Sequence, residues 1–335
     1  MKRLTQIFAF VSLLFFSCSQ AQDSIRISNL SSQTKKIVEQ EGYNHNEWQT
    51  LPIDLKYEFA AYISSFDSDD PINNNKDSIA LGIPEWVSFE IHKIEGEKLK
   101  CKRPTPWLTD KVLHEKGIVP SDDTYKVAGT KKLSVVSGDY RYVRGHVCPF
   151  DAAARISCDA AWNTCITLNA VPQLQWQNNG IWKKLEKNTT DWADKHEKVW
   201  VIAGPVFFDN NPSVWLGQQG EVKAAVPDAL FKIIIRKADT ETGIETISFI
   251  IPNVIPKSKE LHEYVTNIKQ IEELTELTFL NKLSKELQEK EKAKHGMPSL
   301  PDNYSSLSSS EKRKAKDELK KEFYQTNKDL INSWF

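Results

Sequence analysis

The alternation of apolar and polar positions predicts a strand near the start of the second quarter of the chain. Val87, Phe89 and Ile91 alternate with Ser88, Glu90 and other neighbours between residues 86 and 92. This period of two is typical of a half-buried strand. Further strands are predicted at residues 132–136, 164–168, 198–207, 229–236 and 245–252.

Helical patterns flank and interrupt these strands. Leu55, Phe59 and Tyr62 would share one face of a helix over residues 48–64. A second helix is expected to begin near Asn178. Beyond Pro256 the chain is rich in Glu, Lys and Leu, which predicts a helix over residues 268–294.

The last stretch of the chain carries a helix-start signal. Ser308 is followed three residues later by Glu311, the pattern of a capping box. It would open a charged helix whose apolar side contains Leu319, Phe323, Leu330 and Trp334. Because strands predominate and helices are inserted between them, the whole pattern predicts an α+β fold with a largely antiparallel central sheet and a helical C-terminal extension.

The first 21 residues have the pattern of an export signal, with Lys2 and Arg3 preceding an apolar run from residue 4 to 16. This run is too short to span a bilayer as a stable helix. Two processing routes stay open: cleavage before Gln22, or a lipoprotein signal in which Cys18 would be acylated and anchored to lipid. Either route predicts a protein outside the cytoplasm: periplasmic, extracellular, or held at the cell surface.

The composition is that of a folded globular protein, because 40% of the 335 residues are hydrophobic, including 10 Trp and 15 Phe. The net charge of −1 hides a local basic excess. Between Lys98 and His146, eleven Lys or Arg residues stand against five Asp or Glu residues. Such a stretch is either a solvated surface or part of a nucleic-acid site.

Four cysteines remain beyond Cys18, and they permit three disulfide pairings, among which the sequence does not choose; they are Cys101, Cys148, Cys158 and Cys165. Export allows disulfides, while buried free thiols are the plainer alternative. Structural zinc is not favoured, because the chain lacks paired cysteines at ligand spacing.

The segment from Arg144 to Glu186 holds the residue types needed to cut a phosphodiester. His146 can accept a proton near neutral pH, and Arg144 can meet a phosphate with a forked pair of donors. Asn178 and Glu186 would lie on one face of the predicted helix, eight residues apart. Amide and carboxylate oxygens suit magnesium, which keeps most of its waters. The plainer alternative makes Asn178 an N-cap and Glu186 an exposed helix charge.

Three ordered blocks of this segment resemble the DNA/RNA non-specific endonuclease family, the ββα-metal group that includes endonuclease G. The blocks are Arg144–Pro149, Leu168–Gln173 and Asn178–Glu186, with supporting matches at residues 86–89, 201–207 and 226–232. The resemblance implies an endonuclease domain over residues 83–285. It would lie between an N-terminal segment, 22–82, and a charged helical extension, 286–335.

The resemblance also implies roles for single residues. His146 would be the general base, Arg144 a phosphate contact, Asn178 the protein ligand of a hydrated Mg²⁺ (or Mn²⁺) ion, and Glu186 the partner of a water on that ion. DNA and RNA would be the substrates. The sequence leaves the oligomeric state open.

Two positions depart from the family pattern. The acid that usually precedes Arg-Gly-His is replaced by Val143, for which Asp139 is a candidate substitute. The arginine that often follows the helix glutamate by four residues is replaced by Thr190. Contacts to nucleic-acid phosphates would then come from elsewhere, with Lys131, Lys132, Arg141 and Arg155 as candidates.

These departures keep two other classes of protein open. One is a catalytically silent nucleic-acid-binding protein on the same fold. The other is a surface interaction protein in which the tail beyond residue 268 holds a partner.

Overall fold

The fold comes from a computed structural model, which describes residues 31–67, 80–126, 141–208, 212–298, 300–301 and 303–335. The export signal with Cys18, the predicted strand at 132–136, and the residues Lys131, Lys132 and Asp139 lie outside these ranges. Within them, no helix is both long enough and apolar enough to cross a membrane.

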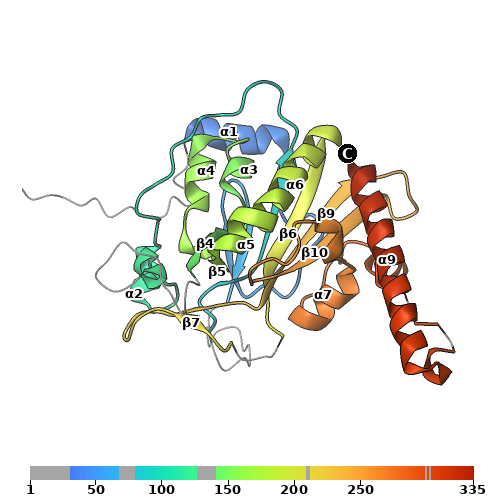
Figure 1. The fold of residues 1–335 in the computed structure, drawn as a ribbon. Coiled ribbons are helices and arrows are strands. Elements are labelled where there is room, and N and C mark those ends of the chain that lie inside the picture. The colour runs from blue at the N-terminus through green and yellow to red at the C-terminus, as the bar shows by residue number, and fades with distance from the viewer. Residues whose placement is uncertain (1–30, 68–79, 127–140, 209–211, 299, 302) are drawn as a thin grey trace, which may run out of the picture.

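A seven-stranded antiparallel sheet forms the centre of the molecule (Figure 1). Its spatial order is β1 (Leu55–Glu58), β2 (Ile63–Phe66), β3 (Pro84–His92), β6 (Lys198–Val206), β9 (Ala229–Lys237), β10 (Ile244–Pro252) and β11 (Val265–Thr266). The central strands are the longest and most apolar, so they carry the core on both faces. The α+β fold with a large antiparallel sheet is therefore confirmed.

Two short ribbons lie outside this sheet. One pairs β4 (Tyr142–His146) with β5 (Ala170–Leu174), and the other pairs β7 (Trp215–Leu216) with β8 (Ala224–Ala225). In the first ribbon His146 lies opposite Ala170. This ribbon holds the residues on which the functional prediction depends.

Helices cover the sheet and its edges. The α-helices are α1 (Ser32–Glu41), α2 (Lys111–Glu115), α3 (Phe150–Ala153), α4 (Cys158–Thr164), α5 (Gln175–Gln177), α6 (Lys183–Lys195), α7 (Ile268–Thr275), α8 (Lys285–Lys292) and α9 (Ser309–Trp334). A π-helical turn, Asn178–Trp182, joins α5 to α6. Short 3₁₀ helices occupy Asp122–Tyr125, Thr167–Asn169, Leu261–Tyr264 and Tyr304–Ser306.

Alternate residues of the central strands enter two separate cores. Val87 and Val201 point to the face covered by α6, where Trp192 is fully buried. Trp86 and Ile202 point to the opposite face, which is covered by α7 through Ile271 and its neighbours. The period of two that the sequence shows is thus the period at which side chains alternate between two packed layers.

The predicted strands at 86–92, 198–207, 229–236 and 245–252 are confirmed with small shifts at their ends. The strand predicted at 164–168 is wrong, because these residues end α4 and form a 3₁₀ turn before β5 begins at Ala170. Their apolar character reflects burial: Cys165, Ile166 and Leu168 are all nearly inaccessible. In an apolar run this short, the sequence pattern does not distinguish a buried irregular segment from a strand.

The helix predicted over residues 48–64 is also wrong. The chain forms the hairpin of β1 and β2, whose turn is closed by Phe59 N–H donating to the Tyr62 carbonyl at 2.8 Å. Leu55, Phe59 and Tyr62 still reach a common core, but by way of this hairpin. Because β1 and β2 extend the sheet from β3, the segment before residue 83 contributes strands to the same layer.

The C-terminal helices are partly as predicted. The helix expected over 268–294 is divided into α7 and α8, because the chain turns at Glu276 with a left-handed φ of 57°. The capping box is confirmed: the Ser308 side chain accepts from the Glu311 N–H, and the Glu311 carboxylate accepts from the Ser308 N–H. Helix α9 then runs along one side of the molecule and ends beside α6 (Figure 1).

The end of α9 is anchored by Trp334. Its ring is 0% exposed and lies 5.3 Å from the ring of Trp192, centroid to centroid. Its carbonyl lies 2.9 Å from Nε2 of His196. The charged helix is therefore fixed to the core through its last turn.

We expect Trp334→Ala to lower the free energy of unfolding by about 3–5 kcal/mol, because a fully buried indole leaves a cavity when it is removed. Urea titration followed by far-UV circular dichroism would measure the loss. Trp176→Ala is the matched control, since Trp176 is 65% exposed, and it should change stability by less than about 0.5 kcal/mol. Equal stability of the two variants would contradict this account of α9.

Candidate active site

Strand β4 presents Arg144 and His146 on either side of a glycine that the packing requires. A Cβ atom on Gly145 would lie only 2.1 Å from Oε1 of Gln173, on the neighbouring strand β5. No side chain larger than hydrogen fits there without moving β5. Gly145 therefore allows the close approach of the strand that leads into the helix of the site.

His146 is partly buried between a ring and a thiol. Its imidazole lies 4.4 Å from the Trp107 ring, centroid to centroid, and its Nε2 lies 3.5 Å from the Sγ of Cys165. Burial, followed by the charges of Arg103 and Arg144, lowers the pKa of His146 to about 3. The imidazole is therefore neutral at neutral pH, the state in which it can accept a proton.

Arg144 is held from two sides. Its guanidinium pairs with the carboxylate of Asp122 and lies 5.2 Å from the centre of the Trp107 ring. Val143 stands opposite Gln173 in the β4–β5 ladder. The acid missing at Val143 thus has a counterpart in Asp122, which comes from a different part of the chain.

Strand β5 continues directly into the helix of the site. The helical backbone begins at Gln175, three residues earlier than predicted, so Asn178 lies inside the helix and is not its N-cap. The π-helical turn from Asn178 to Trp182 widens the helix at this point. Such turns occur mostly as single bulges within α-helices and often at functional sites.

Glu186 lies on α6, one turn beyond this bulge, in a mixed electrostatic environment. Its pKa is raised, first by burial and then by the charge of Asp151, while Lys232 and Arg103 act in the opposite direction. Lys232 comes from β9 and is 1% exposed, with its ammonium 4.2 Å from the centre of the Trp182 ring. Burial lowers the pKa of Lys232 to about 8.

Asn178 and Glu186 carry oxygen atoms of the kind that a hard, hydrated cation prefers. Asn178 is half-buried, and in the described part of the chain its side-chain amide takes part in no hydrogen bond that would compete for it. No group of three or more His, Cys, Asp or Glu side chains among the described residues could hold a metal ion. A metal here would be held by the Asn178 oxygen and by waters, which suits magnesium.

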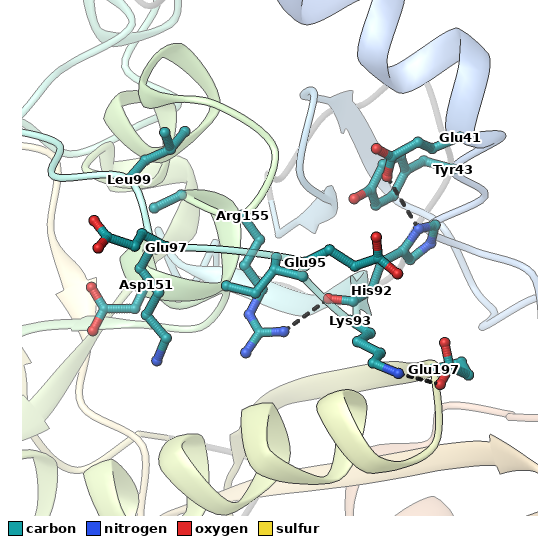
Figure 2. Close-up of a pocket in the computed structure, with 13 residues that line it drawn as sticks. Glu41, Tyr43, His92, Lys93, Glu95, Glu97, Leu99, Asp151, Arg155 and Glu197 are labelled. Atoms are coloured by element: carbon teal, nitrogen blue, oxygen red, sulfur yellow. Dashed lines mark hydrogen bonds and ion pairs between the residues drawn. The ribbon is translucent and has the colours of Figure 1, made fainter.

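The residues predicted to contact nucleic acid lie in different environments. Arg155 donates to both carboxylate oxygens of Asp194, at 2.7 and 2.9 Å, and its side chain is only 3% exposed. It also donates to the His92 carbonyl at 2.8 Å, as Figure 2 shows. Its charge is thus used inside the protein. Arg141 is exposed just before β4, whereas Lys131 and Lys132 lie outside the described residues.

A pocket of about 670 Å³ opens beside Arg155 (Figure 2). Acidic side chains on its walls outnumber the basic ones: the acids are Glu41, Glu95, Glu97, Asp151 and Glu197, and the cations are Lys93, Lys98 and Arg155. Tyr43 and His92 stack on one side with ring centroids 4.0 Å apart. Because phosphates carry negative charge, the excess of acidic side chains does not favour a nucleic-acid backbone in this pocket.

Arg103 is a candidate that the sequence reasoning did not single out. Its side chain is exposed, lies 4.3 Å from the centre of the Phe150 ring, and lowers the pKa of both His146 and Glu186. Its loop is tied to α4 by a disulfide between Cys101 and Cys158. Arg103 belongs to the basic stretch after Lys98. The sequence does not show which cation of this stretch lies near the site, because that depends on the disulfide that fixes the loop.

The low pKa of His146 makes stability depend on pH. The unfolded chain takes up a proton on this side chain near pH ~6.5, whereas the folded chain does so only near its pKa of about 3. Between these values the unfolded state binds more protons, so stability falls as the pH drops.

We therefore expect the free energy of unfolding to decrease from pH 6.5 to 4 more steeply in the natural protein than in His146→Gln. The difference should be about 1 kcal/mol per pH unit, because one extra proton is bound on unfolding. Urea unfolding at four pH values would measure both slopes. Parallel slopes would show that His146 is not kept neutral by its surroundings.

Comparisons with known proteins agree with this geometry. The model of the DNA/RNA non-specific endonuclease family matches residues 59–286, about two thirds of the chain. The human mitochondrial nuclease EXOG is 29% identical over 208 residues, which are 57% of this chain and 50% of that protein. Bovine mitochondrial endonuclease G is 30% identical over 146 residues, 40% of this chain and 48% of that protein.

The chain spans about half the length of these curated relatives. Among solved structures, that of an EndoG/EndoGI complex superimposes with a TM-score of 0.53 at 16% identity, over 77% of this chain and 95% of the other. This likeness concerns the fold alone. The family match over residues 59–286 shows that the chain belongs to the DNA/RNA non-specific endonuclease family.

Proposed function

We propose that this protein is an exported, magnesium-dependent endonuclease that hydrolyses DNA and RNA with little sequence preference. Manganese would be an alternative ion. The observation that carries the proposal is the position of His146, a half-buried imidazole on the strand ribbon that leads into the helix bearing Asn178 and Glu186. Its lowered pKa, to which burial, Arg103 and Arg144 contribute, suits a proton acceptor. The family match supports the same reaction class.

In the proposed reaction His146 takes a proton from a water molecule, whose oxygen attacks phosphorus. The bond to the 3′ oxygen breaks, so the product carries a 5′-phosphate. A magnesium ion, when bound through Asn178, would supply positive charge near the departing oxygen. Arg103, an exposed cation whose charge acts on both His146 and Glu186, would stabilise the negative charge that develops on the phosphoryl oxygens.

Weak sequence preference follows if the contacts go to phosphate. The cations placed around His146 are arginines, whose forked donors match phosphate oxygens but carry no information about the base sequence. This feature supports an enzyme that follows the backbone of either nucleic acid.

Export is part of the proposal and rests on two features. The first 21 residues have the pattern of an export signal. The disulfide between Cys101 and Cys158 suits an oxidising compartment, since cytosolic thiols are kept reduced. Both the soluble form and the form with a lipid anchor at Cys18 are compatible with these features.

Digestion of supercoiled plasmid and of structured RNA tests the activity directly. We expect cleavage of both with Mg²⁺, abolition by a chelator, and a loss of at least ~10²- to 10⁴-fold in His146→Ala, because the general base is removed. Intact substrates in the presence of Mg²⁺, or cleavage that is insensitive to the chelator, would refute the proposal.

Arg103 should matter more than its neighbour. We expect Arg103→Ala to lower kcat/KM by about 10- to 100-fold, because a charge-assisted contact to the phosphoryl group is lost. Lys102→Ala removes an exposed charge one residue away and serves as the matched control, with an expected change of less than about 3-fold. Equal losses in the two variants would mean that only the overall charge of the loop matters.

The second candidate function is a catalytically silent nucleic-acid-binding protein. It is favoured by Thr190, which offers its backbone carbonyl to Arg155 at 3.4 Å and has no charge to offer a phosphate. This alternative predicts binding that weakens steeply with salt and no cleavage under any metal condition. The plasmid assay, together with a filter-binding titration, separates the two functions.

A further inference from the structure

The thiol of Cys165 touches the proposed general base. Its Sγ lies 3.5 Å from Nε2 of His146, and Cys165 itself is 0% exposed. The second free thiol, Cys148, is buried too, but its Sγ approaches the Ala61 carbonyl at 3.9 Å. Both free cysteines are therefore buried thiols, and of the two it is Cys165 that contacts the imidazole.

Contacts from three chain segments hold Cys165 and His146 in this relation. The Cys165 carbonyl accepts a hydrogen bond of 2.8 Å from the N–H of Leu108, and the adjacent Trp107 packs its ring against the imidazole. The imidazole is thus held by the thiol at Nε2 and by an indole 4.4 Å away, centroid to centroid. Rotation of His146 about its side-chain bonds would break both contacts.

The two partners are electrically neutral at neutral pH. Burial raises the pKa of the Cys165 thiol to about 11, against the opposing charges of Arg103 and Arg144. The same two arginines, together with burial, keep His146 unprotonated. A neutral imidazole carries one ring N–H, on either Nδ1 or Nε2. The hydrogen-bond partner of one nitrogen therefore decides whether the other nitrogen donates a proton or accepts one.

We infer that Cys165 is a positioning residue, whose Sγ accepts a hydrogen bond from Nε2–H of His146 and so leaves the Nδ1 lone pair free to take the proton from water. The inference rests on the proposed role of His146 as general base. Nε2 faces the sulfur atom of a fully buried residue, so the inference assigns the attacking water to Nδ1. A base must offer its lone pair to water, which places the ring proton on Nε2.

The contact becomes stronger as the reaction proceeds. When Nδ1 takes the proton from water, the ring becomes an imidazolium, and Nε2–H becomes a charged donor to the same sulfur atom. Hydrogen bonds from charged donors are roughly twice as strong as those between neutral groups. An interaction that is stronger in the transition state than in the ground state raises kcat without tightening substrate binding.

Nitrogen NMR of the full-length protein labelled with ¹⁵N-histidine tests the inference without reference to activity. At pH 7 the His146 signals, assigned by their absence in His146→Gln, should show a protonated Nε2 and an unprotonated Nδ1. In Cys165→Ala the two forms should mix. A proton found on Nδ1 in the natural protein would overturn the inference.

Steady-state kinetics provides the second readout. We expect Cys165→Ala to lower kcat about 3- to 10-fold, the loss of one weak hydrogen bond, with KM changed less than 2-fold. Cys165→Ser, which keeps an acceptor, should recover at least half of the lost kcat. Cys148→Ala removes the other buried thiol and should leave kcat within 2-fold.

The outcomes separate this inference from the proposed function. Full kcat in Cys165→Ala, or equal loss in Cys165→Ser and Cys165→Ala, would overturn the positioning role. If Cys165→Ala does not fold, the serine variant and the tautomer of the natural protein still decide. Full activity in His146→Ala would remove the general-base role itself, whereas the tautomer would remain measurable.

Discussion

The approach of β4 to β5 at Gly145 is the constraint on which the candidate site depends. Because the backbone at this glycine nearly touches the Gln173 side chain, the two strands pair in a single register, with His146 opposite Ala170 and Arg144 opposite Pro172. A slip by one residue would reverse which side chains face the core. The same strand β5 then enters the helix, so the ribbon also fixes where Asn178 and Glu186 stand.

Charge is balanced across this arrangement over a short distance. His146 is kept neutral by burial and by two arginines, while the charge of Lys232 lowers the pKa of Glu186 and that of Asp151 raises it. Lys232 is buried and rests on the Trp182 ring, where it offsets the charge of Glu186 from inside the core. An isolated buried charge would cost several kcal/mol, so each of these two groups makes the other tolerable.

The local pattern of apolar and polar residues is sufficient to predict an element that buries a regular face. Strands β3, β6, β9 and β10 could be predicted because their alternation reports two packed layers. The hairpin of β1 and β2 could not, since Leu55, Phe59 and Tyr62 satisfy a helical spacing equally well. The pairing of β2 with β3 decides between the two structures.

The candidate site shows the same division. The residues His146, Arg144, Asn178 and Glu186 stand in ordered blocks, so the sequence alone could name them, but it could not tell one arginine from another. Arg155 and Arg103 are equivalent as far as the sequence pattern goes, and only long-range contacts distinguish them. Arg155 binds Asp194, 39 residues further along the chain. The loop of Arg103 is fixed by the Cys101–Cys158 disulfide, which joins residues 57 positions apart. Long-range pairs of this kind produce no periodic pattern in the sequence.

The cysteines show how one residue type serves two purposes in the same site. Cys101 and Cys158 form the covalent tether that holds the Arg103 loop against α4. Cys165 and Cys148 are free thiols in the same molecule, and both are buried; their sulfur atoms contact His146 and the Ala61 carbonyl respectively. Burial also keeps the Cys165 thiol protonated, and oxidation proceeds through the thiolate. Burial would therefore protect a sulfur atom beside the proposed general base in the oxidising compartment that the proposed export implies, where an exposed thiol is open to oxidation.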